Sequence, residues 1–280
     1  WFYETFKKRN LHEINIDHLV DFVGPNAEID MCGNNGDPIY HSKFLELCKR
    51  LKANNCKISI TTNGSAKTKT WWQKLNSILD ESDILVFSID GLEDTNHIYR
   101  KNAKWKSIMN AIEVFAKRKC KLHWKYIVFK HNQHQIKDAK ELSTMLKFDN
   151  FRLEHSDRWL GKKDLMPDRE FVDTDYQKQE KIIIDPSYNT EMAPKCLINN
   201  EPSKALYIDA EGDFYPCCWL GTYRYKYKSL FSPKDQKFNI QNNTLDGILG
   251  DTAVKEFFNS TKQFTSAHNC CKIKCGVKNG

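Results

Sequence analysis

The chain has 280 residues, of which 40% are hydrophobic and 12% aromatic, which excludes an intrinsically disordered protein and allows a large core. Lysine and arginine (43) exceed aspartate and glutamate (36) by 7, a mild basic excess that slightly favours an anionic partner. No apolar run is long enough to cross a bilayer and no signal peptide is visible, so we expect a cytoplasmic protein without membrane contact.

Short β-rich runs alternate with amphipathic helices over the first 155 residues. One helix is expected to open at Ser42 as its N-cap, with Phe44, Leu47, Cys48 and Leu51 on one face. The predicted strands are 29–32, 57–61, 84–89, 122–129 and 151–154, and the further helices are 69–79, 94–117 and 133–146. This alternation predicts an α/β fold with a parallel sheet, open or barrel-like.

Polar turns follow three of these strands, at 33–38, 61–64 and 88–91. In parallel α/β folds, ligands bind at the C-terminal ends of the strands. The three turns therefore predict a shared binding site.

The second half changes character. Residues 161–194 are charged and contain several prolines, which favours a segment that bridges two domains. A short hairpin is expected from 206–208 and 214–215, turning at Glu211 and Gly212, and a helix at 245–258. We therefore divide the chain into a domain at 1–160, the bridge at 161–194 and a cysteine-rich α+β domain at 195–280.

Six of the ten cysteines fall between Cys196 and Cys275. In a protein without an export signal, clustered cysteines indicate metal ligands rather than disulfides. Four thiolates bind either zinc or an iron–sulfur cluster. A structural zinc site usually shows close cysteine pairs at both ends, whereas Cys196 and Cys217 are far apart, so the spacing argues against an ordinary zinc ribbon without excluding zinc.

The pattern Cys-x₁₅-Gly-x₄-Cys, with the segment Ile208–Cys218 and the later cysteines, resembles the SPASM and shorter twitch domains of radical S-adenosylmethionine (SAM) enzymes. These domains bind auxiliary [4Fe–4S] clusters. Too few cysteines remain for the full SPASM pattern, so the one-cluster twitch form fits better. The resemblance implies the ligands Cys196, Cys217, Cys271 and Cys275, with Cys270 as the alternative to Cys271 and Cys218 as a bystander.

The first half resembles the same family independently, as a partial (β/α)6 radical SAM barrel. The turn Asn35-Gly36-Asp37-Pro38 is similar to the family's Gly-Gly-Glu-Pro turn, which engages the amino group of SAM. Thr62 and Asn63 match its Thr-Asn-Gly strand ending. Ser88 and Asp90, in a segment similar to the fourth strand, are implied contacts of the ribose or methionine part. The run from Val128 to Asn132 is similar to the fifth strand, where the family contacts adenine.

One feature of the family is missing from the sequence. Radical SAM enzymes bind the catalytic [4Fe–4S] cluster through Cys-x₃-Cys-x₂-Cys after the first strand, and neither that strand nor that triplet occurs in the chain. We expect the sequence to be truncated there, and the chain as given to bind SAM poorly and not to cleave it.

The resemblance implies a radical SAM enzyme. In such enzymes the reduced catalytic cluster cleaves SAM to a 5′-deoxyadenosyl radical, which abstracts hydrogen from a substrate, here an unknown peptide or small molecule. An electron donor such as a flavodoxin or ferredoxin is the implied partner. No residue is assigned a catalytic role.

Two alternatives stay open. The first is a non-catalytic metal-binding interaction protein on the same fold. The second is a different barrel enzyme, such as a lyase, that uses Asp37 and Asp90 for acid–base chemistry. The segment 223–228 alternates tyrosine with lysine and arginine, which suits nucleic-acid binding. An exposed strand with alternating faces is the preferred interpretation of that segment.

Overall fold

The computed structural model describes most of the chain and divides it into two compact units. One unit is Gly24–Gln177, and the other combines Trp1–Val23 with Lys178–Gly280. The described residues are 13–33, 36–154, 164–171, 190–191, 206–222, 237–261, 266–275 and 277–278.

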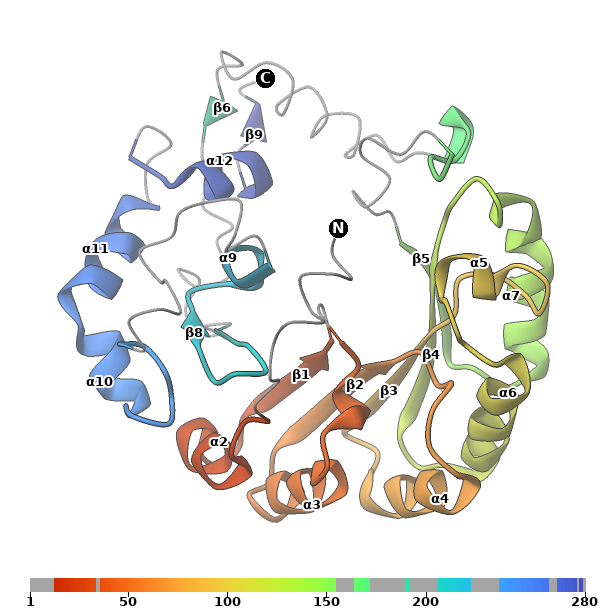
Figure 1. The fold of residues 1–280 in the computed structure, drawn as a ribbon, viewed down its shortest axis with the longest axis horizontal. Coiled ribbons are helices and arrows are strands. Elements are labelled where there is room, and N and C mark those ends of the chain that lie inside the picture. The colour runs from red at the N-terminus through yellow and green to blue at the C-terminus, as the bar shows by residue number, and fades with distance from the viewer. Residues whose placement is uncertain are drawn as a thin grey trace. The chain divides into compact units, whose positions relative to one another are not determined.

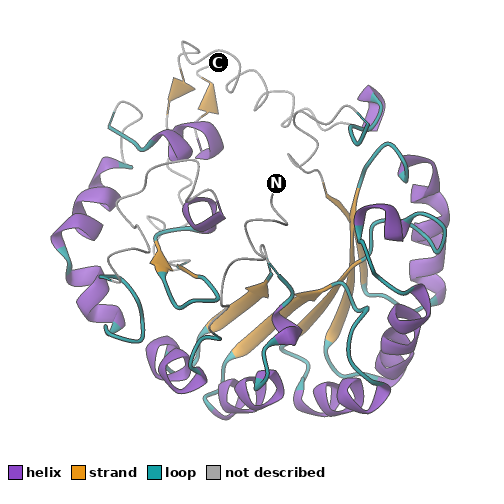
Figure 2. Cartoon of the chain, viewed as in Figure 1, coloured by secondary structure: helices purple, strands orange, loops and turns teal. Residues whose placement is uncertain are grey.

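A parallel five-stranded sheet forms the centre of the first unit (Figures 1 and 2). Its strands are β1 (Glu28–Cys32), β2 (Lys57–Thr62), β3 (Ile84–Ser88), β4 (Lys121–Ile127) and β5 (Asn150–Glu154). They lie in sequence order, and every neighbouring pair is parallel. All five predicted strands are therefore confirmed, as is the α/β fold class.

Helices connect the strands and cover one face of the sheet, as Figure 2 shows. The α-helices are α3 (Phe44–Ala53), α4 (Lys69–Ile78), α5 (Asn96–Tyr99), α6 (Trp105–Val114) and α7 (Ile136–Met145). The 3₁₀ helices of this unit are η1 (Pro38–Tyr40), η2 (Phe115–Lys117), η3 (Gln133–Gln135) and η5 (Arg169–Phe171). This arrangement leaves the C-terminal ends of the strands together at one edge of the sheet, where the polar turns were expected to meet.

The sheet's two faces differ because buried and more exposed residues alternate along its strands. In β2 the residues Ile58, Ile60 and Thr62 are buried, whereas those between them are exposed or half-buried. The buried face packs an aromatic core: the ring of Phe87 lies 6.0 Å from Trp72 of α4 and 6.5 Å from Phe115, centroid to centroid. Burial of such large side chains is the main source of stability in this unit.

Two helix predictions need correction. The helix expected at 94–117 is broken into α5, α6 and η2, and Asn102 between α5 and α6 takes a left-handed backbone with φ of 66°. The N-cap of α3 is Lys43 rather than Ser42, and it makes no capping bond through its side chain. The expected face of α3 is correct, since Phe44, Leu47, Cys48 and Leu51 are all buried.

The second unit is smaller and mixed. Its helices are α2 (Ile16–Val23), α9 (Cys218–Thr222), α10 (Leu245–Gly250), α11 (Thr252–Ser260) and α12 (Asn269–Cys275). Its two antiparallel pairs are β6 (Thr190–Glu191) with β9 (Val277–Lys278), and β7 (Tyr207–Ile208) with β8 (Phe214–Tyr215). The predicted hairpin is thus present, and Gly212 at its turn has a positive φ of 85°.

The boundary between the units differs from the predicted one. The sequence placed residues 1–160 in one domain, whereas Trp1–Val23 group with the C-terminal unit. The reason is burial: Ile14 joins the hydrophobic cluster of Phe214 and Tyr215, with Leu19 and Phe22 packed against it. The predicted bridge at 161–194 lies mostly outside the described residues.

The helix predicted at 245–258 is divided. It breaks at Asp251, whose side chain accepts a hydrogen bond from the backbone nitrogen of Ala253 and caps α11. A capping aspartate stabilises the start of a new helix rather than the continuation of the previous one.

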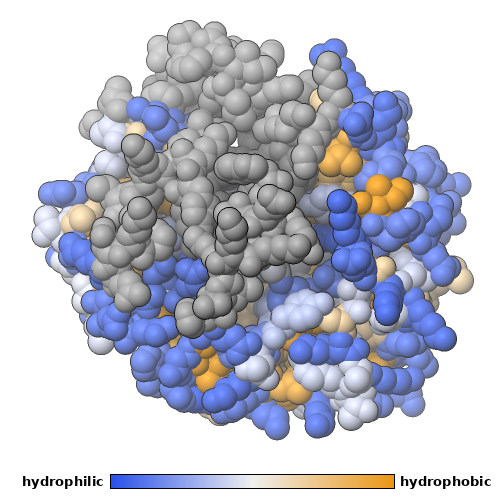
Figure 3. Space-filling view, in the orientation of Figure 1, coloured by the Kyte–Doolittle hydropathy of each residue, from blue (hydrophilic) through white to orange (hydrophobic). Residues whose placement is uncertain are grey.

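The described surface in Figure 3 is largely hydrophilic, with apolar residues in separate spots. Large exposed apolar side chains include Tyr40, Met145 and Trp219. Among the described helices, none has the length and apolar character that crossing a bilayer requires.

Candidate functional site

Asp37 lies just beyond β1 and is tied to the end of β2. Its Oδ2 accepts hydrogen bonds from the hydroxyl of Thr62 and from the backbone nitrogen of Asn63, both at 2.8 Å. Its Oδ1 accepts a longer bond of 3.3 Å from the nitrogen of Ile39 and caps η1. Burial raises the pKa of Asp37, although these bonds and the nearby Arg100 oppose the shift. The predicted residues Asp37, Thr62 and Asn63 are therefore brought together.

The turn after β2 depends on Gly64. Its φ is 71°, and a Cβ at this position would lie 2.6 Å from the ring of Phe87. Only glycine fits both the left-handed backbone and the close ring. Gly64 thereby allows the chain to turn directly after Thr62 and Asn63.

Asp90, beyond the end of β3, forms a buried ion pair with Arg100. Nε of Arg100 lies 2.6 Å from Oδ2 of Asp90, whose side chain is fully buried. The other carboxylate oxygen accepts a bond of 2.7 Å from the backbone nitrogen of Ile127 in β4. Nη2 of Arg100 donates to the hydroxyl of Ser88. Ser88 and Asp90 are thus brought together as predicted, but both hold Arg100, a residue that the sequence did not assign to the site.

This arrangement bears on the lyase alternative. Both carboxylate oxygens of Asp90 are engaged by Arg100 and Ile127, and its side chain has no exposed surface. A substrate cannot reach a carboxylate that is fully buried, so the acid–base role considered for Asp90 lacks support, whereas Asp37 is only partly buried.

Opposite charges face each other across the strand ends. Arg100 is close enough to Asp37 to lower the pKa of that carboxyl electrostatically. The side chain of Arg100 is partly exposed (22%), and within the described residues its Nη1 makes no hydrogen bond. A carboxylate beside a guanidinium with free donors suits a zwitterion, since each charge of an α-amino acid meets its opposite.

Asn132 and Val128 were predicted to contact the cofactor, and in the structure both side chains are buried. The side-chain nitrogen of Asn132 donates to the carbonyls of Asp90 and Ile127, both at 2.9 Å, and its Oδ1 accepts from Phe129. Asn132 is fully buried, and Val128 is 1% exposed. Asn132 holds the ends of β3 and β4 together, and a direct contact between either side chain and a ligand stays a prediction.

The remaining predicted cofactor residues surround the same turn. Gly36 is exposed, and Pro38 begins η1. Asn35 lies outside the described residues.

Three of the candidate cysteine ligands in the second unit lie in or against one hydrophobic cluster of side chains. Cys270 (1% exposed) and Cys271 (8% exposed) belong to the hydrophobic cluster, and Cys217 packs against it. Helix α12 carries Cys270 and Cys271, and helix α9 begins directly after Cys217. The two helices are in contact. Cys218 is exposed, consistent with a bystander. The residue Cys196 and the side chain of Cys275 lie outside what the structure describes.

The helix α12 distinguishes the alternative ligands. Positions 271 and 275 are four residues apart within one helix, so they share a face, whereas 270 and 275 do not. This spacing favours Cys271 over Cys270 as the partner of Cys275.

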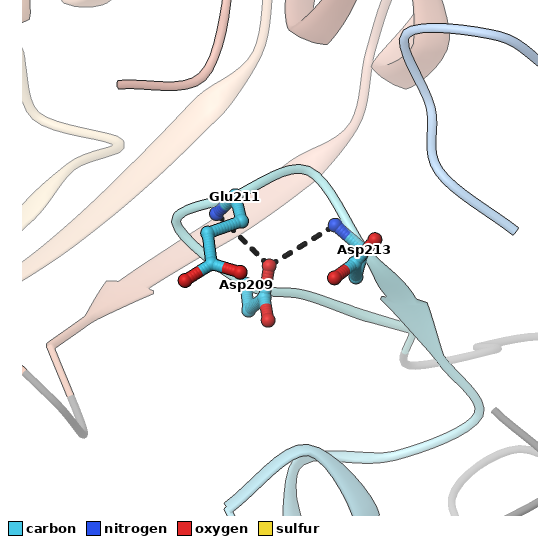
Figure 4. A group of neighbouring side chains, drawn as sticks. All are labelled: Asp209, Glu211 and Asp213. Carbon is cyan, nitrogen blue, oxygen red and sulfur yellow. Dashed lines mark hydrogen bonds between the residues drawn. The ribbon is translucent and has the colours of Figure 1, made fainter. Parts of the chain in front are cut away.

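An acidic turn links β7 and β8 (Figure 4). Oδ1 of Asp209 accepts bonds from the backbone nitrogens of Glu211 (2.9 Å) and Asp213 (3.0 Å). Asp209, Glu211 and Asp213 are the one group of three possible metal ligands whose donor atoms converge within 4.8 Å among the described residues. Asp209 stabilises the hairpin turn that precedes Cys217, which accounts for the geometry without a metal ion.

One family model matches the C-terminal part of the chain. Residues 196–276 match the SPASM family, described as an iron–sulfur cluster-binding domain. No curated protein matches the sequence significantly.

Solved structures share the fold at low sequence identity. SuiB of Streptococcus suis matches with a TM-score of 0.56 and 15% identity over 98% of this chain and 81% of SuiB. Native anSMEcpe with bound AdoMet and Cp18Cys peptide matches with a TM-score of 0.50 and 13% identity, over 94% and 78% of the two chains. SuiB bound to S-adenosylmethionine matches with a TM-score of 0.51 and 14% identity, over 80% of this chain and 56% of that SuiB chain.

These comparisons confirm the resemblance predicted from the sequence: a fold of the radical SAM type, followed by a SPASM domain. The shorter twitch form, which the cysteine count favoured, stays a prediction.

Proposed function

We propose that this chain is the SAM-binding and auxiliary-cluster-binding part of a radical SAM enzyme that modifies a peptide or small molecule. The observation that carries the proposal is the pair of Asp37 and Arg100 at the C-terminal edge of the sheet. SAM has an α-ammonium and an α-carboxylate on one carbon. Asp37 accepts from the ammonium, and Nη1 of Arg100 donates to the carboxylate.

The supporting residues keep these two charges in place before a ligand arrives. Thr62 and Asn63 fix the carboxylate of Asp37, while Asp90 and Ser88 fix the guanidinium of Arg100. Preorganised charges lose little freedom on binding, which favours affinity and a single orientation of the ligand.

In the second unit, Cys196, Cys217, Cys271 and Cys275 are the proposed ligands of one [4Fe–4S] cluster, with Cys270 as the alternative to Cys271. The donor set is chemically suitable because thiolates are the normal ligands of such clusters. The match of residues 196–276 to an iron–sulfur cluster-binding domain supports this assignment. An auxiliary cluster supplies a site for binding substrate or for passing electrons.

The catalytic cluster does not fit the residues present. Its Cys-x₃-Cys-x₂-Cys triplet does not occur in the 280 residues, and Cys48, Cys56 and Cys120 are buried in the first unit. We therefore derive no step of SAM cleavage from this chain. Reductive cleavage to a 5′-deoxyadenosyl radical is proposed for a protein in which the triplet completes this site, with a flavodoxin or ferredoxin as electron donor.

A peptide is the favoured class of substrate. Structures of similar fold contain peptides: anSMEcpe with Cp18Cys peptide, and SuiB with the precursor peptide SuiA at a TM-score of 0.50 and 14% identity. At such identity the likeness supports the fold alone, so the substrate class rests on analogy.

Binding of SAM and of decarboxylated SAM tests the site directly. Isothermal titration of the chain should show weak but measurable binding of SAM, and binding of the decarboxylated form should be at least about tenfold weaker because one charge-assisted bond is lost. Equal affinities would refute the role of Arg100. Absence of binding by both would refute the proposed site.

A further inference from the structure

The face of the sheet that points away from the helices is basic in β4 and β5. A parallel sheet is normally covered on both faces, and its strands are then apolar throughout. In β4 the buried residues alternate with exposed or half-buried ones: Leu122, Trp124 and Tyr126 against Lys121, His123 and Lys125. The buried set faces the helices, because Trp124 is the register partner of Phe87, which packs on α4. Lys125 is the register partner of Arg152 in β5, so Arg152 lies on the open face.

Positive charge exceeds negative charge on this part of the face. Nε of Arg152 lies 2.7 Å from Oε1 of Glu154, and Oε2 of the same carboxylate lies 3.8 Å from Nζ of Lys125. One carboxylate is thus shared by two cations, and the exposed Lys121 adds a third. We call Lys121, Lys125 and Arg152 the basic row.

His123 lies among these cations and does not add to their charge. Burial lowers its pKa, and the charges of Arg152 and Lys121 act in the same direction, whereas Asp149 opposes them. The imidazole is therefore neutral near pH 7. Asp149 does not balance the row either, because its Oδ2 is paired with Nη2 of Arg118 at 2.8 Å.

The basic row is accessible to a ligand. The side chain of Arg152 is 56% exposed, and those of Lys125 and Glu154 are 28% and 29% exposed. Water screens ion pairs at such exposure, so this group contributes little to the stability of the fold. A guanidinium has more donors than one carboxylate uses, so Arg152 can bind a second carboxylate beside Glu154.

A cavity of about 360 Å³ adjoins the basic row. Its lining includes Ser59 of β2 and Ile84 of β3, which are register partners on the open face. Ile84 is also the register partner of Lys121, so the cavity and the row are neighbours. The half-buried Ile84 provides an apolar wall, and the volume is in the range of small-ligand sites. The face therefore offers room for an apolar side chain beside a place for an anion.

We propose that this face binds a peptide substrate whose acidic side chain pairs with Lys125 and Arg152 and whose neighbouring apolar side chain enters the cavity. This inference rests on the proposed function and specifies the chemistry of its substrate. Lys125 is the register partner of Ser88, which accepts a bond from Arg100 at the proposed SAM site. A peptide held by the basic row therefore lies beside that site.

A peptide fits this face better than a nucleic acid does. Nucleic acids present a continuous row of phosphates, and single strands stack their bases on aromatic side chains. The strand residues on this face include no phenylalanine, tyrosine or tryptophan. The exposed carboxylate of Asp30 in β1 would also repel a phosphate chain that extends across the sheet.

Two hexapeptides with the same label test the proposal, one of alternating valine and glutamate and one of alternating valine and glutamine. Fluorescence anisotropy should show that the wild type binds the glutamate peptide at least about fivefold more tightly. Arg152→Gln should lose most of this preference. Glu154→Gln should bind the glutamate peptide about two- to fivefold more tightly than the wild type does, because it releases both cations. The matched control is Lys69→Gln, an exposed cation on α4, which should behave as the wild type.

Equal binding of the two peptides by the wild type, or an unchanged preference in Arg152→Gln, would overturn the inference. So would weaker binding of the glutamate peptide by Glu154→Gln, whose expected gain no folding defect can imitate. A single-stranded oligonucleotide that binds as tightly as the glutamate peptide would also overturn it, in favour of a nucleic-acid surface. Titration of the wild type with SAM separates the two proposals. SAM binding without a preference for glutamate refutes this inference alone, whereas that preference without SAM binding refutes the proposed function.

Discussion

Arg100 reaches back across the end of β3 to form an ion pair with Asp90, with Nε and Oδ2 2.6 Å apart and the carboxylate fully buried. The same arginine donates to Ser88 and influences Asp37 electrostatically. One guanidinium therefore links the turns after β1 and β3, and the candidate site depends on its position.

Replacing Asp90 by asparagine should destabilise the protein strongly. The change leaves the guanidinium of Arg100 without its counter-charge and weakens the bond to Ile127, so we expect a loss of about 3–5 kcal/mol in the free energy of unfolding. Urea denaturation measures it. The control is Glu28→Gln, which breaks the exposed pair with Lys57 and should leave the free energy of unfolding nearly unchanged. Equal effects of the two variants would contradict the structural importance of the buried pair.

Asp37→Asn should weaken SAM binding without unfolding the site. The amide keeps an oxygen acceptor for Thr62 or Asn63 but loses the charge that pairs with the ammonium. We expect the dissociation constant to rise about 10- to 100-fold. Asp30→Asn, on an exposed part of β1, is the matched control and should leave binding unchanged. Similar losses in both variants would indicate a nonspecific charge effect.

The same carboxylate predicts a pH dependence. Burial raises the pKa of Asp37, and only the ionised form attracts an ammonium. SAM affinity should therefore be level at neutral pH and decline as the pH falls through this raised pKa, at a higher pH than an ordinary aspartate would require. Titrations between pH 8 and the onset of acid unfolding measure the decline. Its persistence in Asp37→Asn would assign it to another group.

Gly64→Ala should destabilise the first unit. The alanine would have to adopt a backbone φ of 71°, and its methyl group would lie 2.6 Å from the ring of Phe87. We expect a cost of about 2–3 kcal/mol, measured by urea denaturation. Gly250→Ala is the control, since a Cβ there meets nothing within 4 Å. A neutral Gly64→Ala would mean that the turn after β2 tolerates a side chain.

Cys48 and Cys120 of the first unit should react slowly with alkylating reagents. Burial raises the pKa of Cys48 and of Cys120 to about 12, so both are protonated at neutral pH. The exposed Cys218 should be modified first. Mass spectrometry after brief treatment with iodoacetamide gives the order, and rapid labelling of Cys48 would contradict its placement in the core.

The sequence predicted the strands well because local pattern determines them. The run from Ile84 to Ile89 is apolar on both faces, as a central parallel strand requires, and β2 alternates. The prediction of one continuous helix at 94–117 was wrong. The helical periodicity of the sequence continues there, but Arg100 must turn back to Asp90 after the short helix α5. Tertiary contacts override helix propensity at that point.

The candidate site was predicted in location but not in role. Motif matching indicated Asp37, Thr62 and Asn63, whose bonds to each other the structure shows. It could not distinguish Asn132, a brace with all its side-chain bonds inside the protein, from His131, whose nitrogens are unpaired. Two partners of the Asn132 side chain, Ile127 and Phe129, are close in sequence, but the third, Asp90, is 42 residues distant, and no local pattern encodes that contact. Helix α2 was missed for a similar reason, because its Leu19 and Phe22 pack against a cluster that contains Phe214 and Tyr215, which are distant in sequence.

Iron and acid-labile sulfide, measured per chain after anaerobic purification, test the C-terminal unit most directly. A [4Fe–4S] cluster predicts about four of each in the wild type and in Cys218→Ser, with a large loss of both in Cys217→Ser. Zinc without sulfide in the wild type, or full iron and sulfide in Cys217→Ser, would contradict the assignment.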